Sequence, residues 1–226
     1  MRSLSSIAVI PDGNRRYARS SGLNSREAYV KGFDKVKSVV EWAREEGVES
    51  ATFWALSLDN FTKRSKTELD VVLSLLEDRI DEFLSEGSRD ARLNFFGRLD
   101  LLPEKLSEKF LQAEKQSSSN QGPQLNFAVA YNGRDELFHA AKKLAEDYKR
   151  GEAILTPEEF EKRLYYRDAP DLVIRTGSTN RLSGFLPWQA EYSELFFSQQ
   201  LWPEFSRDEF NRAIEFYKNS ENRKGR

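Results

Sequence analysis

The sequence predicts a single α/β domain in which a central, mostly parallel six-stranded sheet is flanked by helices. Six short apolar segments of strand character alternate with helical segments, a pattern typical of βαβ units whose sheet is covered on both faces. The chain has 226 residues, enough for one domain with a full core. It shows no internal repeat and no long linker. We therefore expect residues 1–226 to form one domain.

The first half of the chain predicts three strands, each followed by a helix. An apolar run at residues 7–10 predicts the first strand, which Pro11 ends. Apolar residues at helical spacing predict a helix over residues 26–46, which Gly47 ends. The further elements are strands at residues 51–56 and 92–96, a long helix that Ser65 or Thr67 begins and that extends through Leu84, and a charged helix over residues 103–116.

The second half continues the alternation after a polar loop at residues 117–123. A strand at residues 125–130 precedes a helix that ends near Gly151. Thr156-Pro157-Glu158-Glu159 has the capping chemistry of a short helix. The remaining elements are a strand at residues 171–175, a polar loop at 176–184, a strand at 194–197 and a helix at 206–217.

Composition excludes several classes of function. The net charge of −2 gives no overall field for nucleic acid, so we expect no nucleic-acid partner. Without cysteine there are no disulfides or thiolate metal sites, and His139 is the only histidine available for Ser-His or Cys-His catalysis. No apolar run approaches the roughly 20 residues that span a bilayer, and the first six residues are too short and polar for a signal peptide. We expect a cytoplasmic protein.

Polar and charged residues follow three of the predicted strands. Because the carboxyl ends of parallel strands share one edge of the sheet, where ligands bind in open α/β folds, we expect these loops to converge on one pocket. In chain order the loops contribute Asp12, Gly13, Asn14 and Arg16, then Ser57, Asn60, Lys63 and Arg64, then Arg175, Arg181 and Ser183.

This set of residues suits an anionic substrate bound together with a divalent metal. Arginine binds phosphate oxygens through a planar fork, and Mg²⁺ is commonly held by one or two carboxylates plus substrate phosphates. A lone Asp12 among arginines therefore fits a Mg²⁺-diphosphate better than a metal site made by protein alone. Pro11-Asp12-Gly13 is also good β-turn chemistry, and a single arginine is often a solvated surface residue. Arg175, directly after an apolar strand, needs a partner.

Other phosphate-binding motifs are absent from the sequence. There is no Gly-x-x-x-x-Gly-Lys-Ser/Thr and no Gly-x-Gly-x-x-Gly, so neither a P-loop nor a dinucleotide fingerprint is present. Asp12 could act as a phosphatase nucleophile, but Asn14 stands where a second aspartate would be required. The paired-aspartate runs of trans-type prenyl synthases are also missing.

Several motifs in the same order resemble the cis-prenyltransferases, the undecaprenyl and dehydrodolichyl diphosphate synthase family. The similarity extends from about residue 7 to the C-terminus. It implies the fold of that family, with a hydrophobic tunnel between the sheet and the helices near residues 26–46 and 66–86. The motifs that carry it are Pro-Asp-Gly-Asn-Arg-Arg-Tyr-Ala at 11–18, Asp-Asn-Phe and a basic pair at 59–64, Asp-Leu-Val-Ile-Arg-Thr-Gly at 171–177, Arg-Leu-Ser-Gly-Phe-Leu-Pro-Trp-Gln at 181–189, Glu-Leu-Phe-Phe at 194–197 and Leu-Trp-Pro-Glu-Phe at 201–205.

The resemblance implies a role for each motif. Asp12 and Asn60 would be the catalytic residues, and Asp12 would hold Mg²⁺ against the diphosphate of an allylic primer, with Glu194 as a second residue near the metal. The first loop would bind the primer, and the third would bind isopentenyl diphosphate. The substrate-binding residues that it implies are Gly13, Asn14, Arg16, Tyr17, Arg26, Tyr29, Ser57, Phe61, Lys63, Arg64, Arg175, Arg181, Ser183 and Arg223.

The sequence departs from the family pattern at several positions. Tyr29 stands where the family usually has a histidine, and Thr179 and Asn180 replace a glutamate and a histidine. The second loop is one residue longer than usual, so either Lys63 or Arg64 could act as the family's arginine. At the C-terminus, Arg223-Lys224-Gly225 fits an Arg-x-Gly motif that reaches the active site across a homodimer interface.

The expected function is Mg²⁺-dependent cis-condensation of isopentenyl diphosphate with an allylic prenyl diphosphate, to make a polyprenyl diphosphate for a lipid glycosyl carrier. A homodimer with peripheral membrane association for product release is the expected assembly. Two alternatives remain: a non-catalytic partner subunit of a heteromeric cis-prenyltransferase, or a prenyltransferase with another acceptor. Such subunits generally lose the first loop, which this chain keeps. A third, weaker alternative is a phosphate-ester hydrolase that uses Asp12.

Overall fold

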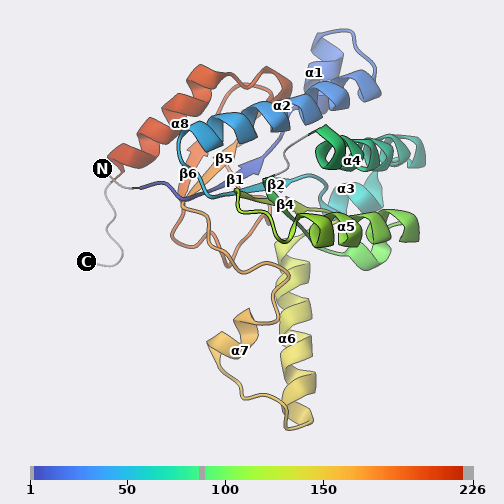
Figure 1. Ribbon diagram of the computed structural model, residues 1–226, viewed down its shortest axis with the longest axis vertical. Helices are drawn as coiled ribbons and strands as arrows, with labels where there is room; N and C mark the ends of the chain where they lie inside the picture. The colour runs from blue at the N-terminus through green and yellow to red at the C-terminus, as the bar shows by residue number, and fades with distance from the viewer. Residues whose placement is uncertain (1–2, 87–89, 221–226) are drawn as a thin grey trace.

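A wholly parallel six-stranded sheet organises the fold in the computed structural model, which describes residues 3–86 and 90–220 (Figure 1). The strands are β1 (Ser6–Ile10), β2 (Ser50–Trp54), β3 (Arg92–Phe96), β4 (Gln124–Ala128), β5 (Leu172–Arg175) and β6 (Glu194–Phe197). Their order across the sheet is β3-β4-β2-β1-β5-β6. Every neighbouring pair is parallel, which confirms the predicted sheet.

Helices connect the strands in chain order. Asn24 caps the helix predicted over residues 26–46 with a reciprocal capping box that involves Glu27. The helices are α1 (Asn14–Ser20), α2 (Ser25–Glu45), α3 (Leu58–Lys63), α4 (Lys66–Glu86), α5 (Glu104–Ser117), α6 (Gly133–Lys149), α7 (Pro157–Glu161) and α8 (Arg207–Asn219), with the 3₁₀ turns η1 (Leu99–Leu101) and η2 (Trp202–Glu204). Among the residues described, no helix is both long enough and apolar enough to cross a bilayer.

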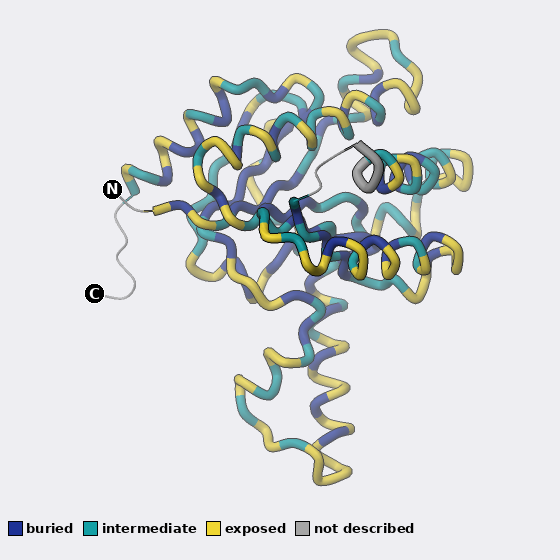
Figure 2. The backbone as a smooth tube through the Cα atoms, in the orientation of Figure 1, coloured by how far each residue is buried: buried dark blue, intermediate teal, exposed yellow. Residues whose placement is uncertain are grey.

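The two faces of the sheet are covered differently. On one face, Ile7 and Val9 of β1 join a core shared with α2, α4, α5 and α8. On the other face, Ala8 and Ile10 pack with side chains of the segment 165–190, much of which is not helical. Because strand side chains alternate between faces, one apolar run supplies both cores. Figure 2 shows the buried backbone concentrated in this central part.

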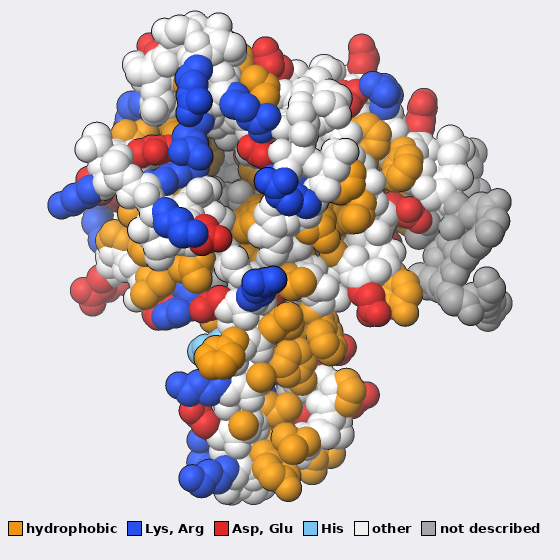
Figure 3. Space-filling view, turned by 180° about the vertical axis from the view of Figure 1, so that it is seen from behind, with side chains coloured by type: hydrophobic (Ala, Val, Ile, Leu, Met, Phe, Trp, Pro, Cys, Tyr) orange, Lys and Arg blue, Asp and Glu red, His pale blue; other side chains and the backbone are white. Residues whose placement is uncertain are grey.

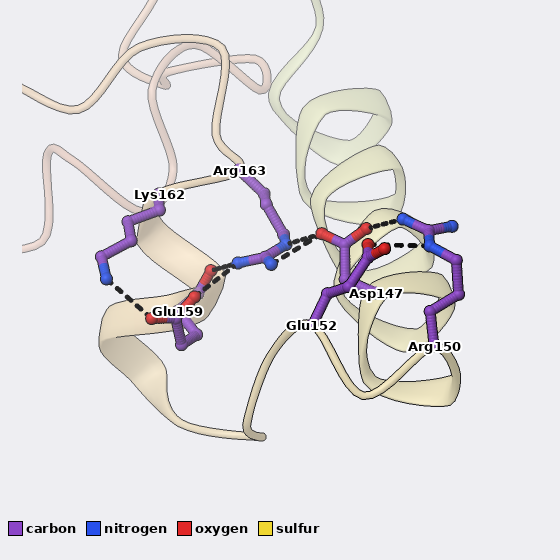
Figure 4. Close-up of polar contacts among 6 residues, drawn as sticks. All are labelled: Asp147, Arg150, Glu152, Glu159, Lys162 and Arg163. Carbon is purple, nitrogen blue, oxygen red and sulfur yellow. Dashed lines mark hydrogen bonds and ion pairs between the residues drawn. The ribbon is translucent and has the colours of Figure 1, made fainter.

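Residues 133–166, which we call the α6–α7 arm, project away from the sheet (Figure 1). Ion pairs hold its two helices together (Figure 4). Asp147 near the end of α6 pairs with Arg163 at 2.6 Å and with Arg150, and Arg163 also pairs with Glu159 of α7 at 2.9 Å. The side chains of Asp147 and Arg163 are largely buried, so this network fixes α7 against α6.

Two short helices stand where the sequence predicted strand-end loops. Gly13 caps α1, and its φ of 122° is a backbone conformation that residues other than glycine rarely adopt. The Ser57 hydroxyl accepts from the Asn60 N–H at 3.0 Å and caps α3. The fourth strand ends at Ala128, earlier than predicted, because the chain turns at Ala130 with φ of 48°.

Candidate active site

A cavity of about 600 Å³ opens beyond the carboxyl ends of β1, β2 and β5. All three predicted loops reach it, which agrees with the position of ligand sites in open parallel sheets. Among its described lining residues, Asp12 is the only acid, and six are arginines: Arg15, Arg16, Arg19, Arg64, Arg175 and Arg181. An apolar inner wall, which includes Phe33, Val36, Phe53, Val72 and Phe127, lies behind these charges.

Asp12 joins the first loop to the third. Its Oδ1 pairs with Arg16 at 3.1 Å and its Oδ2 accepts from Arg175 at 3.0 Å. Arg175 also donates to the Arg181 carbonyl at 2.5 Å and to the Ser183 hydroxyl at 2.8 Å. The side chain of Arg175 is only 7% exposed, so its charge depends on these contacts. The sequence indicated that Arg175 needs a partner, and in the structure its anionic partner is Asp12.

The backbone at Asp12 is fixed by two other segments. Its carbonyl accepts from the Trp202 N–H at 3.0 Å and from the Thr176 hydroxyl at 2.8 Å. A Cβ at Gly177 would lie 2.8 Å from this carbonyl oxygen and 2.4 Å from Arg16 Nη2, so only glycine fits there. The Trp202 indole in turn donates to the Gly32 carbonyl at 2.7 Å, which ties η2 to α2. The first loop is thus preorganised before any ligand binds.

Asn14 presents an unsatisfied acceptor in the cavity. Its Nδ2 donates to the Pro11 carbonyl at 3.3 Å, whereas its Oδ1 is buried without a partner among the described residues. A Cβ at Gly32 would lie 2.3 Å from this Oδ1, so glycine leaves the amide its place. The Asn14 side chain is therefore held between the Pro11 carbonyl and Gly32.

The second loop resolves the choice between Lys63 and Arg64. Arg64 lines the cavity together with Ser57 and Asn60, whereas Lys63 is exposed and pairs with Asp59 at 2.6 Å. The Arg64 guanidinium lies 5.4 Å from the centre of the Tyr29 ring and 3.5 Å from Glu68. Arg64 is therefore the residue at the cavity.

Tyr29 connects α2 to α4 at the cavity. Its hydroxyl donates to Glu68 at 2.9 Å, and it occupies the position where a histidine is usual in the family that the sequence resembles. Burial, with a further contribution from Glu68, raises the pKa of Tyr29 to about 12. Tyr29 is therefore a neutral hydrogen-bond donor throughout the physiological range.

The raised pKa of Tyr29 predicts a stability difference at alkaline pH. The folded protein holds this proton more tightly than the unfolded chain, so the stabilisation is complete below pH 10 and is lost as pH rises through about 12. Relative to Tyr29→Phe, we expect the wild type to lose up to about 3 kcal/mol of unfolding free energy over that range. Urea unfolding of both proteins between pH 8 and 12 measures this difference. The other tyrosines affect both proteins equally, so their contributions cancel. Parallel curves would contradict it.

Several predicted residues lie outside the cavity. Tyr17 and Phe61 are half-buried, and Phe61 packs against the main core. Arg26 is exposed and lies 3.6 Å from Asp78. Glu194 begins β6 in register with Leu172, three positions before the pair Arg175–Phe197, so it lies toward the amino edge of the sheet and away from Asp12. Arg223 lies outside the described residues.

Glu194 lies apart from the other predicted residues because β6 begins at this residue, whereas most of the others follow strands. Conversely, Arg15 and Arg19 line the cavity but were not predicted. They lie four residues apart, on one face of α1, which the sequence analysis did not identify as a helix. Trp202 belongs to one of the motifs, yet nothing in the sequence indicated that its backbone N–H would hold the Asp12 carbonyl.

Comparison with known proteins identifies the family. The family model described as putative undecaprenyl diphosphate synthase matches residues 10–225. The chain belongs to the undecaprenyl diphosphate synthase family. It is 39% identical over 228 residues to a tritrans,polycis-undecaprenyl-diphosphate synthase (geranylgeranyl-diphosphate specific) of Thermoplasma acidophilum, covering 97% of this chain and 88% of the relative. It is 37% identical over 229 residues to an isoprenyl transferase of Thermotoga maritima, covering 100% and 98%.

Solved structures of this family share the fold. A lavandulyl diphosphate synthase from Lavandula x intermedia, in complex with dimethylallyl diphosphate, matches with a TM-score of 0.93 at 31% identity over 99% of both chains. A probable undecaprenyl diphosphate synthase from Campylobacter jejuni matches with a TM-score of 0.83 at 31% identity over 100% of both. The predicted fold and the predicted class of enzyme, a prenyltransferase of the cis type, are confirmed.

Proposed function

We propose that the protein catalyses Mg²⁺-dependent cis-condensation of isopentenyl diphosphate with an allylic prenyl diphosphate. The observation that carries this proposal is one cavity in which a single carboxylate and six arginines face an apolar wall. Such a cavity fits a ligand with a diphosphate at one end and a hydrocarbon at the other. The relatives named as prenyl diphosphate synthases support the same chemistry.

The residues at Asp12 fit a metal that is shared with substrate. Among the described residues, no three His, Cys, Asp or Glu side chains group closely enough to hold a metal by themselves. Mg²⁺ is usually held by one or two carboxylates plus substrate phosphates, so Asp12 would hold it together with diphosphate oxygens. When bound, the metal would neutralise charge on the departing diphosphate.

The chain's own residues would divide the two substrates. Arg16 and Asn14 line the cavity with Asp12 and would bind the primer diphosphate through their N–H groups, whereas Arg175, Arg181 and Ser183 would bind that of isopentenyl diphosphate. Asn60, at the same cavity, would orient the reacting groups. The guanidinium groups, already positioned by hydrogen bonds, would stabilise the charge that develops as the allylic diphosphate leaves. The apolar wall would hold the isoprenyl chain and exclude water.

The test uses purified protein, Mg²⁺, labelled isopentenyl diphosphate and allylic primers of several lengths. We expect labelled polyprenyl diphosphates, and we expect a chelator to stop their formation. An absence of labelled prenyl product with every primer would refute the proposal. A partner subunit without activity of its own would give that result, although the complete first loop and its cavity argue against this alternative.

A second acceptor has a specific structural argument. This chain is similar to a lavandulyl diphosphate synthase whose structure holds an allylic diphosphate, dimethylallyl diphosphate. If an allylic diphosphate also served as acceptor here, a labelled allylic primer alone would give a prenylated product without isopentenyl diphosphate. Omitting isopentenyl diphosphate from the assay distinguishes the two acceptors.

We include a homodimer in the proposal, formed through the α6–α7 arm and the neighbouring segment 186–193. Large apolar side chains are exposed there, and Figure 3 shows them gathered along the arm. Monomeric proteins rarely expose an apolar surface this continuous. The side chains concerned are Phe138, Tyr148, Ile154, Leu155, Trp188 and Tyr192.

Phe138→Glu is expected to convert the dimer to a monomer, because it places a charge at the centre of an apolar interface. Phe138 is 74% exposed, so folding should not depend on it. Leu111→Glu is the matched control: Leu111 is 64% exposed on α5, outside the arm. Sedimentation analysis measures the mass of each protein. A dimeric Phe138→Glu variant would place the interface elsewhere.

Peripheral contact with a membrane also belongs to this proposal. An isoprenyl product would partition into lipid, since each buried CH₂ contributes about 0.8 kcal/mol. Release at a bilayer surface would therefore be easier than release into water.

A further inference from the structure

A second cavity of about 70 Å³ lies beyond the apolar wall of the main cavity. Phe33, Val36 and Phe127 line both cavities, so these side chains form the partition between them. The other side chains that line the second cavity are the apolar Leu76, Ile80, Leu93 and Phe95, and the charged Lys37 and Arg79. Apolar side chains thus separate the main cavity from a second cavity that two cations border.

Those two cations belong to a group of ion pairs that links α2 to α4. Arg79 of α4 pairs with Asp34 at 2.9 Å and with Glu82 at 2.5 Å, and Lys37 of α2 pairs with Glu82 at 2.8 Å. We call Asp34, Lys37, Arg79 and Glu82 the α2–α4 ion-pair cluster. Hydrogen bonds from Lys37 and Arg79 lower the pKa of Glu82, so the cluster stays charged at neutral pH.

Arg79 is the member of the cluster least able to accept an apolar neighbour. Its side chain is 20% exposed, and its Nε is buried without a hydrogen-bond partner among the described residues. A hydrocarbon that pressed further against this guanidinium would strip away the remaining solvent from a charge whose hydrogen bonding is already incomplete. By contrast, the apolar side chains that line the second cavity would stabilise each added carbon by burying it.

We propose that the α2–α4 ion-pair cluster is the stop that limits the length of the isoprenyl product. This inference rests on the proposed function, because it requires a chain that grows from the diphosphate sites into the apolar cavity. The growing end displaces the Phe33–Val36–Phe127 partition, fills the second cavity and then meets Arg79. Further additions become unfavourable at that point, and the product is released.

The test compares the lengths of products from the wild type and from Arg79→Met, Lys37→Met and Lys109→Met. Methionine retains the reach of the side chain and removes its charge. Lys109 is the matched control, because it is also 20% exposed and pairs with two acids of α4, Glu77 and Asp81, yet lines neither cavity. Labelled products are dephosphorylated and separated by chain length. The rate of the first addition is measured in parallel.

We expect Arg79→Met to lengthen the main product by at least one five-carbon unit, and Lys37→Met to lengthen it less. The rate of the first addition should stay within about twofold of the wild type in all three variants. Wild-type product lengths in both Arg79→Met and Lys37→Met would overturn the proposal, and so would an equal lengthening in Lys109→Met. Lys37 is half-exposed, so its variant keeps the test valid if Arg79→Met folds poorly. A wild type without any product would refute the proposed function. A wild type with product, together with variants whose product lengths are unchanged, would refute only the role of the ion-pair cluster.

Discussion

Asp12→Asn is expected to lower the turnover rate by about 10³-fold, the loss typical of removing a preorganised electrostatic group from an active site. The substitution keeps the shape of the side chain and removes its charge. It would take away the one acidic ligand that the cavity offers to a metal, and it would leave Arg16 and Arg175 without their anionic partner. Steady-state rates at saturating Mg²⁺ and substrates measure the effect.

Asp59→Asn serves as the control for this prediction. Asp59 lies at the same edge of the sheet and pairs with Lys63 four residues later, just as Asp12 pairs with Arg16, but Asp59 does not line the cavity. We expect normal turnover from Asp59→Asn. Near-normal turnover from Asp12→Asn, with circular dichroism unchanged in both, would show that the metal site lies elsewhere.

Arg175→Lys is expected to lower kcat/KM for isopentenyl diphosphate by about 10²-fold. A lysine keeps the charge, but it cannot contact Asp12, the Arg181 carbonyl and Ser183 simultaneously through a planar fork. The buried groups left unpaired would also reduce the unfolding free energy by about 1–3 kcal/mol. Kinetics with each substrate varied in turn, together with urea unfolding, separate the two effects.

Arg92→Lys provides the matched comparison. Arg92 also uses its fork on a strand, where it contacts Gln124 and the Asn120 carbonyl, but it begins β3 and lies at the amino edge of the sheet. We expect Arg92→Lys to lose some stability and to keep its kinetic constants. If Arg175→Lys lost stability without any change in kcat/KM for isopentenyl diphosphate, Arg175 would have only a structural role.

The sheet could be predicted from sequence because its strands are buried on both faces. Runs such as residues 7–10 are apolar at every position, and the helices between them show clear periodicity. The helices α1 and α3 were missed because neither has an apolar stripe. Arg15, Arg16 and Arg19 give α1 a charged surface, and α3 follows its cap Ser57 in a run that is mostly polar. Short helices whose polar side chains face a cavity do not show the pattern of a helix that packs on a core.

The sequence predicts which residues share the cavity where they directly follow strands, and it gives less information about the others. Asp12 and Arg175 were placed correctly in one pocket because the ends of parallel strands must meet. The choice between Lys63 and Arg64 depends on the phase of α3, which sequence spacing did not fix. The contact between the Trp202 indole and the Gly32 carbonyl joins residues 170 positions apart, and no local signal predicts it. Nothing in the sequence of α4 indicated that Arg79 would border a cavity.

Both carboxylate oxygens of Asp12 are engaged, one by Arg16 and one by Arg175. A metal ion that took the place of one guanidinium would leave it without its anionic partner, and a diphosphate that arrived with the metal would supply a new one. The two binding events would then be thermodynamically linked, so that each ligand would raise the affinity of the other by the same factor. A titration with Mg²⁺ alone should show weak binding, and the midpoint should shift to lower metal concentration as diphosphate is added. The protein would thus take up metal in proportion to its substrate supply rather than to the free metal around it.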